Sequence, residues 1–313
     1  MSHGIPTERL GSAEEFLDGL MRWHQRWQPF PSEWIFRGQA DCRWGLIPSA
    51  LRSNASFSFG TSSSFAPQTT FSRQIHSEAI VVQAFIREVD RQGLALPTEY
   101  ATRWRDFSAM IGTLISPQGY AEWPPGDLAP VVALAQHHGI PTRLLDWTDR
   151  ALVAAYFAAI DLLENHRGSP AIAVWALATG RAMAVINGAL KDRLYPQLRI
   201  VRPPRATNAN LRAQEGVFTL LVEGPKDGEA SAAQPSIDDL IAARAVALGT
   251  SGSPVGVGTL RKLELGAEHA PKLLRLLASE LVSATQLYPG LEGVVRGMQE
   301  RSLWDVPSPP PGI

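Results

Sequence analysis

The chain has 313 residues with 45% hydrophobic and 19% charged residues, a composition that excludes a disordered chain and allows one large domain or two smaller ones. A formal net charge of -1 gives no overall attraction to nucleic acid or to an acidic membrane surface, so any such contact must be local. Cys42 is the only cysteine, which excludes an intrachain disulfide and a multi-cysteine metal site, and no apolar run approaches the roughly 20 residues of a membrane helix, so we expect a cytoplasmic protein without a membrane partner.

The N-terminal segment is expected to be helical. A capping-box pattern from Ser12 to Glu15 predicts the start of a helix, because the two side chains satisfy exposed backbone N–H groups there. Residues 16–27 continue with apolar side chains at helical spacing, and Pro29 and Pro31 end the run.

The next segment combines strand character with a charged side chain. Residues 34–36 have the composition of a strand that ends at Arg37 and Gly38. Residues 44–47 alternate as a second short strand. We therefore expect a hairpin-like unit with Arg37 near its turn.

Residues 53–74 are rich in Ser, Thr, Phe, Gly and Pro with few charges, and we expect a flexible excursion there. Apolar periodicity predicts helices over 78–89, 103–114, 127–135, 148–163, 237–248 and 270–281, with Asp127 as an N-cap and Gly139 as a stop. Buried strands are predicted over 171–177, 217–222 and 258–265.

These elements favour an α+β fold, in which mainly late strands form a central sheet flanked by several helices. No change of composition marks a domain boundary, so we expect a single domain over residues 34–300 that includes the 53–74 excursion. Residues 1–33 would form an N-terminal helical segment, and residues 301–313 a C-terminal tail.

Two segments a hundred residues apart place polar groups inside apolar sequence, and the first contains Arg37. Its guanidinium supplies forked donors for an anion, and Gly38 lets a ligand approach the backbone. The alternative is a buried ion pair of Arg37 with Asp146 or another acid.

The second segment, residues 135–147, is predicted to be mostly a connector between two helices. His137 and His138 lie in the last turn of the first helix, and their side chains diverge by about 100°, so they suit one metal ion poorly and we expect none. One of them can serve as a hydrogen-bond donor or base at a cleft, or can simply cap the helix. Arg143 and Asp146 either pair with each other as a structural clasp or orient a polar group at the cleft.

Residues 193–212 form the only strongly basic stretch of the chain. It contains no acidic residue and carries Arg193, Arg199, Arg202, Arg205 and Arg212. Such a strip can contact phosphates or an acidic partner, and the alternative is a solvated loop. Arg212 and Gln214 stand just before a predicted strand, where a side chain is well placed to meet a ligand.

The familiar catalytic patterns are missing. The sequence has no P-loop, no dinucleotide-binding glycine fingerprint, no G-x-S-x-G elbow and no H-E-x-x-H. A nuclease or phosphodiesterase built on His137 and His138 is less attractive, because no carboxylate cluster for metal ions is evident.

Several motifs closely resemble the FRG-domain family. They are Phe36-Arg-Gly-Gln39, Trp44-x-Leu-x-Pro-Ser49 with Leu51-Arg52, Ala135 to Thr148, Tyr156-Phe157-Ala158, Val174-Trp-Ala-Leu177, Arg212-Ala-Gln-x-Gly-x-Phe218 and Leu287-Tyr-Pro-x-Leu-x-Gly293. The resemblance covers most of the chain from Trp34 to Gly293. The family name by itself implies no reaction.

The aromatic-Arg-Gly strand also resembles the first motif of mono-ADP-ribosyltransferases, in which the arginine grips a phosphate of NAD. This resemblance implies that Arg37 holds the pyrophosphate of NAD and that Trp44 or Trp147 stacks on nicotinamide or adenine. It also implies that Gln214 or Glu215 lies near the ribose, with Glu215 as the carboxylate that stabilises the oxocarbenium-like centre. The cofactor-binding candidates are Arg37, Gly38, Gln39, Trp44, Arg143, Asp146, Trp147 and Arg212, and the catalytic candidates are Glu215, Gln214 and His137.

The resemblance implies an NAD-dependent enzyme that modifies a nucleic acid or a protein, with the 193–212 strip as the contact to this acceptor. A role as a toxin or phage-defence effector would be in keeping with such an activity. The competing hypothesis is a non-catalytic binding module that recognises a phosphate-bearing ligand or partner.

Overall fold

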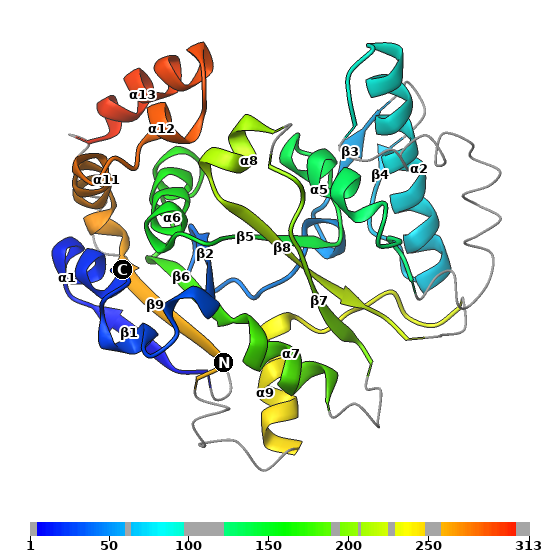
Figure 1. Ribbon diagram of the computed structural model, residues 1–313, viewed down its shortest axis with the longest axis horizontal. Helices are drawn as coiled ribbons and strands as arrows, with labels where there is room; N and C mark the ends of the chain where they lie inside the picture. Colours follow the sequence, from blue (N-terminus) through cyan, green and yellow to red (C-terminus); the bar gives the residue numbers. More distant parts are fainter. Residues whose placement is uncertain are drawn as a thin grey trace.

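The computed structural model describes residues 5–59, 64–96, 122–188, 195–205, 208–224, 229–247 and 258–304. Its centre is a mixed sheet of seven strands, β1 (Thr7–Leu10), β2 (Trp34–Gln39), β5 (Leu144–Thr148), β6 (Ala171–Ala178), β7 (Gln197–Val201), β8 (Gly216–Val222) and β9 (Leu260–Gly266). The strand order is β1-β9-β6-β2-β5-β8-β7 (Figure 1), and only β1 and β9 run parallel. The predicted α+β fold is confirmed.

The helices form two groups on one face of the sheet and one group on the other. They are α1 (Ala13–Leu20), α2 (Phe71–Arg91), α5 (Ala129–His137), α6 (Ala151–Asn165), α7 (Thr179–Asn187), α8 (Ala209–Ala213), α9 (Ile237–Ala247), α11 (Ala270–Ser279), α12 (Ala284–Leu287) and α13 (Leu291–Leu303). Helices α1, α6 and α11 pack over β9, β6 and β2, whereas α2 and α5 pack over β5 and β8. Helices α7 and α9 cover the opposite face.

Strand alternation explains this layering. Phe36 and Val174 belong to the core under α6, while Ile35 and Trp175, their neighbours in sequence, belong to the core under α7 and α9. Every residue of β6 is buried, because this strand is covered on both faces and paired on both edges. Among the described residues, no helix is long and apolar enough to cross a membrane.

Most of the predicted helices and strands are confirmed within a few residues. The capping box is present: the Ser12 hydroxyl accepts from the N–H of Glu15, whose carboxylate accepts from the N–H of Gly11. Gly139 ends α5 with φ +87, a conformation that glycine adopts at little cost. The predicted N-cap at Asp127 is wrong, because Leu128 takes that position. The predicted helix over 103–114 lies outside the described residues.

The predicted hairpin with Arg37 near its turn is wrong. Residues 44–47 form no strand, and the N–H of Leu46 donates instead to the buried carboxylate of Asp238 at 2.9 Å. Strand β2 pairs with β6, which is more than a hundred residues away, and Arg37 lies opposite Trp175 in the middle of that pairing. The apolar pattern of a short strand does not show which strand it pairs with, because the pairing partner and register also depend on residues far away in the sequence.

The predicted connector over 135–147 is also wrong in its second half. Strand β5 occupies Leu144–Thr148 and pairs antiparallel along its whole length with β8, from Leu144 opposite Leu220 to Thr148 opposite Gly216. The polar Arg143 and Asp146 interrupt the apolar pattern, so the sequence did not indicate a strand here. Apart from Asp146, the residues of β5 are buried.

The predicted excursion over 53–74 contains regular structure. Strands β3 (Phe57–Ser58) and β4 (Ser64–Phe65) form a small antiparallel sheet, and α2 begins at Phe71 rather than at the predicted residue 78. Among the described elements, those that no pattern predicted include β1, β7, α7, α8, α12 and α13. Of these, β7 lies inside the basic strip as an edge strand.

A buried ion pair joins α2 to the start of β5. The Arg143 guanidinium donates to Glu78 through Nε at 2.7 Å and Nη2 at 2.9 Å, and both side chains are 3% exposed. The Glu78 carboxylate also accepts from Trp123 Nε1 at 3.0 Å and from Gln74 Nε2 at 2.8 Å. The predicted alternative of an Arg143–Asp146 clasp is therefore wrong, and Arg143 serves the core rather than a cleft.

Replacing Arg143 by Met should lower the free energy of unfolding by about 3–5 kcal/mol, because Glu78 would keep a buried charge without its counter-ion. The matched control is Arg91→Met on the same helix as Glu78, since Arg91 pairs with Glu88 in an exposed contact that should contribute no more than about 1 kcal/mol. Urea unfolding followed by circular dichroism measures both. Equal losses in the two variants would contradict the structural role assigned to the pair.

Candidate functional site

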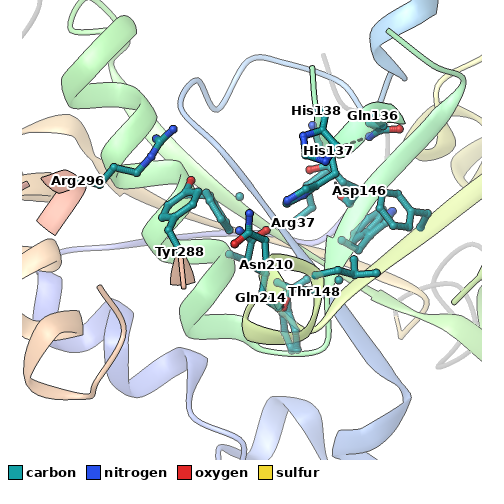
Figure 2. A pocket seen from close by; sticks show the side chains of 18 of the residues that line it. Arg37, Gln136, His137, His138, Asp146, Thr148, Asn210, Gln214, Tyr288 and Arg296 are labelled. Atoms are coloured by element: carbon teal, nitrogen blue, oxygen red, sulfur yellow. Dashed lines mark hydrogen bonds and ion pairs between the residues drawn. The ribbon is translucent and has the colours of Figure 1, made fainter. Parts of the chain in front are cut away.

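A cavity of about 570 Å³ lies on the sheet between the two helix groups, with α5 on one side and α6 on the other (Figures 1 and 2). Its floor comes from β2, β5 and β8, and its rim from α8, the end of α12 and α13. The polar residues that line it are Arg37, Gln136, His137, His138, Asp146, Thr148, Asn210, Gln214, Tyr288, Glu292 and Arg296.

The cavity forms because β2 and β5 separate. These neighbouring strands share a single residue pair, Phe36 with Thr148, whereas β2 pairs with β6 along its whole length. Past that one pair, each strand leaves backbone groups without the other as a partner. The guanidinium of Arg37 occupies the gap and donates from Nη1 to the backbone carbonyl of Asp146 at 2.8 Å.

Arg37 and Asp146 also form an ion pair in the wall of the cavity. Arg37 Nη1 lies 2.6 Å from Asp146 Oδ1. The two partners differ in accessibility, since the Arg37 side chain is 10% exposed and that of Asp146 is 60% exposed. Both bonds use the same nitrogen, and Nε of Arg37 is buried without a hydrogen-bond partner in the part of the chain that the structure describes. The Arg37–Asp146 ion pair, which the sequence analysis gave as the alternative to a ligand site, is thus present, and both residues also line a cavity.

The charge of Arg37 keeps Asp146 ionised. Surrounding protein atoms push the pKa of Asp146 upward, but the Arg37 guanidinium outweighs this effect, and the pKa falls below its ordinary value. Gln136 donates from Nε2 to Asp146 Oδ1 at 3.1 Å, and its own carbonyl accepts from the hydroxyl of Thr142 at 2.5 Å. The carboxylate is therefore fixed by a side chain that the sequence motif contained but that was not predicted as a site residue.

His137 and His138 line the cavity from the end of α5. Their rings are 5.4 Å apart at an angle of 81°, so they face different directions. Burial lowers the pKa of His137, and the nearby His138 lowers it further, so the His137 imidazole is uncharged at neutral pH. Among the described residues, no group of three or more His, Cys, Asp and Glu side chains is arranged to hold a metal ion.

The opposite rim comes from late segments of the chain. Figure 2 shows Tyr288 and Arg296 across the cavity from the histidines, with Asn210 and Gln214 between the two sides. Gln214 donates to the carbonyl of Leu287 at 3.3 Å, and its own carbonyl accepts from Thr148 Oγ1 at 2.7 Å.

Aromatic rings in this rim form a possible stacking surface. The Tyr288 ring lies 4.4 Å from the Arg296 guanidinium carbon and packs edge-on to Phe157 at 6.5 Å. Burial raises the pKa of Tyr288, so its hydroxyl is protonated at neutral pH. Tyr288 belongs to a motif segment that carried a signal, whereas no sequence pattern singled out Phe157 as a ligand contact or pointed to Arg296.

The structure brings Arg37, Gly38, His137, Asp146, Trp147 and Gln214 to the cavity, and the other candidates lie elsewhere. The Gln39 amide accepts from Trp175 Nε1 at 2.7 Å and donates to the carbonyl of Gly45 at 3.1 Å, inside the core. Trp44 packs edge-on to His166 at 4.8 Å. Trp147 borders the cavity, but its ring is buried in the core and Nε1 donates to Thr219 at 2.9 Å.

The last two candidates lie near the rim without lining it. Arg212 is exposed on α8. Glu215 has φ +47, an unfavourable backbone conformation for a residue with a side chain, and its carboxylate faces Arg150 at 3.9 Å. The two residues just before β8 thus have different surroundings, because Gln214 lines the cavity and the Glu215 carboxylate faces Arg150.

Gly38 is required by helix packing. A Cβ added there would lie 1.9 Å from the carbonyl oxygen of Ala154 in α6, a distance that no real contact allows. The glycine therefore permits α6 to rest directly on β2. The predicted reason, close approach of a ligand to the backbone, is not needed to explain this residue.

Gly38→Ala should destabilise the fold by about 3 kcal/mol or more, because the backbone of β2 or α6 must shift to make room. Gly45→Ala is the control, since its added Cβ would meet the Asp238 oxygens and the Ser236 Cβ at ordinary distances of 3.6 and 3.7 Å. Thermal unfolding of both variants tests this. A midpoint for Gly38→Ala as high as that of the control would contradict the packing constraint.

The stability contribution of Asp146 should depend on pH in the acid range. Because the folded-state pKa is lowered, the ionised carboxylate stabilises the fold above the ordinary aspartate pKa of about 3.9, and this stabilisation is lost as the pH falls through the lower folded-state pKa. The free energy of unfolding of the wild type should therefore exceed that of Asp146→Asn near neutral pH and approach it below about pH 4. Urea titrations at stepped pH measure the difference, and a difference that stays constant with pH would contradict this electrostatic role.

Comparison with known proteins gives one match. Residues 32–167 match the model of the FRG domain. No curated protein and no solved structure matches the chain.

The matched segment contains β2, α2, α5, β5 and α6, and thus Arg37, the two histidines and Asp146 of the cavity. Gln214 and Tyr288, on the opposite rim, follow it in the sequence. The segment that matches the FRG domain therefore supplies β2 and β5 of the cavity floor and, through α5 and α6, two of its walls.

Proposed function

We propose that the cavity binds NAD and that the protein transfers ADP-ribose from NAD to a macromolecular acceptor. The observation that carries this proposal is the state of Arg37, which lies in the wall of a cavity with one nitrogen engaged and Nε without a partner among the described residues. A volume of about 570 Å³ is within the usual range for small-molecule sites. The resemblance of the Phe36-Arg-Gly strand to the first motif of mono-ADP-ribosyltransferases supports the same assignment.

Arg37 is suited to bind a phosphate while it keeps its structural contacts with Asp146. Its contacts with Asp146 fix the guanidinium, and the donors that these contacts leave over can serve an anionic oxygen. The neutral side chains of His137, Asn210 and Gln214 offer further hydrogen bonds to phosphate or ribose oxygens. The Tyr288 and Phe157 rings are better placed than Trp44 or Trp147 to stack on a base, because the two tryptophans are engaged away from the cavity.

The reaction needs a negative charge near the ribose. Nicotinamide leaves with the electrons of its bond to ribose, positive charge develops on the sugar, and the acceptor then forms a bond to C1′ and loses a proton. Asp146 is ionised and lines the cavity, so the geometry favours it over Glu215 as the stabilising carboxylate. The uncharged His137 can accept the proton of the acceptor.

One observation favours the non-catalytic alternative. Asp146 is held by Arg37 at 2.6 Å and by Gln136 at 3.1 Å, a satisfied arrangement that could bind a phosphate-bearing ligand without turning it over. The two functions differ in nicotinamide release rather than in binding.

Calorimetric titration with NAD, followed by measurement of nicotinamide release in the presence of cell extract, separates them. Arg37→Gln should weaken NAD binding by about 10-fold or more, the loss expected for a hydrogen-bonded charge. His137→Ala should lower nicotinamide release with little change in affinity. Arg91→Gln, an exposed arginine on α2, is the control and should match the wild type.

Wild-type protein that neither binds nor cleaves NAD would contradict the proposal. Binding without nicotinamide release in any extract would favour the binding module. Circular dichroism of each variant verifies that a lost affinity does not come from a lost fold.

A further inference from the structure

We propose that a cluster of arginines around Asp149, next to the cavity, binds the phosphate backbone of a nucleic acid. The inference rests on the proposed function in one respect, because it would make nucleic acid the acceptor class. The surface itself is argued from the arginines alone.

Asp149 gathers three arginines from separate parts of the chain. Arg202 donates from Nη1 to both carboxylate oxygens at 2.8 and 3.0 Å, and Arg205 donates from Nη2 at 2.8 Å. Arg22 donates from Nη2 to the Asp149 carbonyl at 3.1 Å. Through its carboxylate and its backbone carbonyl together, Asp149 thus holds side chains that lie almost two hundred residues apart in the sequence.

A second carboxylate lies beside the first. The N–H of Asp149 donates to the Glu215 carbonyl at 3.1 Å, which explains how the unfavourable φ of Glu215 is held. The Glu215 carboxylate faces Arg150 at 3.9 Å. Arg212 is exposed three residues before Glu215, on α8. Two acidic side chains therefore fix the positions of a larger number of arginines, and a positive excess remains.

The arginines stay accessible in spite of these contacts. The side chains of Arg202 and Arg205 are 47% and 37% exposed, and Arg212 and Arg22 are exposed as well. Arginines held in place by an internal carboxylate lose less conformational entropy when they bind a phosphate. The chain as a whole is almost neutral, so this local excess stands out against the rest of the surface.

The cluster adjoins the cavity at two points. Asp149 follows Thr148 and Glu215 follows Gln214, and both preceding residues line the cavity. A nucleic-acid strand held by these arginines would pass the cavity rim, where an attacking group could reach a bound nucleotide. Trp23, next to Arg22 in sequence, is 71% exposed and could stack on a base.

A protein acceptor is less favoured by the geometry. The exposed apolar residues of α13, Leu291, Val295 and Met298, would suit a protein partner. However, helical spacing places them roughly a third of a turn away from Glu292 and Arg296, the residues of α13 that line the cavity. The apolar face is therefore turned aside from the cavity, whereas the arginine cluster borders it.

Fluorescence polarisation of labelled 20-nucleotide single-stranded DNA and RNA, without NAD, tests the surface. The full chain should bind at low salt, and the affinity should fall steeply with added salt, as expected for phosphate contacts. The double variant Arg202→Gln/Arg205→Gln should lose about 10-fold or more in affinity. The slope of log K against log salt concentration should become shallower by about 1.4, the value expected for the loss of two single-strand phosphate contacts. Arg73→Gln/Arg91→Gln removes the same charge from exposed positions on α2 and should match the wild type.

Because the double variant also removes two partners from Asp149, Arg212→Gln is a second test that leaves these contacts in place. No side-chain contact of Arg212 is broken by this change among the described residues, and the affinity should still fall several-fold. No binding of either oligonucleotide at low salt, or an equal loss in the α2 control, would overturn the proposal. The proposal would also be overturned if the chain bound neither oligonucleotide and transferred ADP-ribose from NAD to proteins, giving a product that nuclease treatment does not remove. If the protein bound the oligonucleotides but neither bound nor cleaved NAD, the nucleic-acid surface would be supported and the proposed function would be contradicted.

Discussion

The Arg37–Asp146 contact is the interaction on which the arrangement of this molecule depends. Strands β2 and β5 lie next to each other in the sheet yet share one residue pair, so the sheet would be weakened at its centre without a further link. The guanidinium of Arg37 supplies that link by binding both the backbone carbonyl and the carboxylate of Asp146. The same separation opens the cavity, so the charged groups that hold the strands are also the ones that a ligand would meet.

The two ion pairs that involve residues 135–147, Arg143–Glu78 and Asp146–Arg37, have different roles. Arg143 and Asp146 stand three residues apart, but Arg143 is buried against Glu78 and Asp146 faces the cavity. A buried pair joined by two hydrogen bonds, away from the cavity, contributes rigidity rather than ligand binding. An accessible carboxylate with its pKa lowered by one arginine is instead available for chemistry. The rigid pair anchors the start of β5, and the rest of the strand can then hold Asp146 in position.

The sequence allowed the α+β class, the long helices and the buried strands to be predicted, because apolar periodicity is a local property. It failed at β5, where Arg143 and Asp146 break the pattern, and at the partner of β2, because pairing depends on residues more than a hundred positions away. For the site, Arg37, His137 and Gln214 were each named as candidates from the sequence, and the fold places all three on one cavity. Gln39 and Trp44 were named as candidates from the motifs around Arg37. Only the fold shows that Gln39 is bound to Trp175 in the core and that Trp44 packs against His166. Tyr288 and Arg296 needed the packing of α12 and α13, which no local pattern describes.

The strand order also limits what the matched segment can be as a physical unit. Residues 32–167 include β2 and β5, but the strands on their outer edges, β6 and β8, begin only at Ala171 and Gly216. Cut out at those limits, the segment would hold only two strands of the central sheet with one shared pair, and the remaining N–H and C=O groups of these strands would be left facing solvent. The matched segment thus contains two of the seven strands of the central sheet, and the cavity is formed by this segment together with later residues.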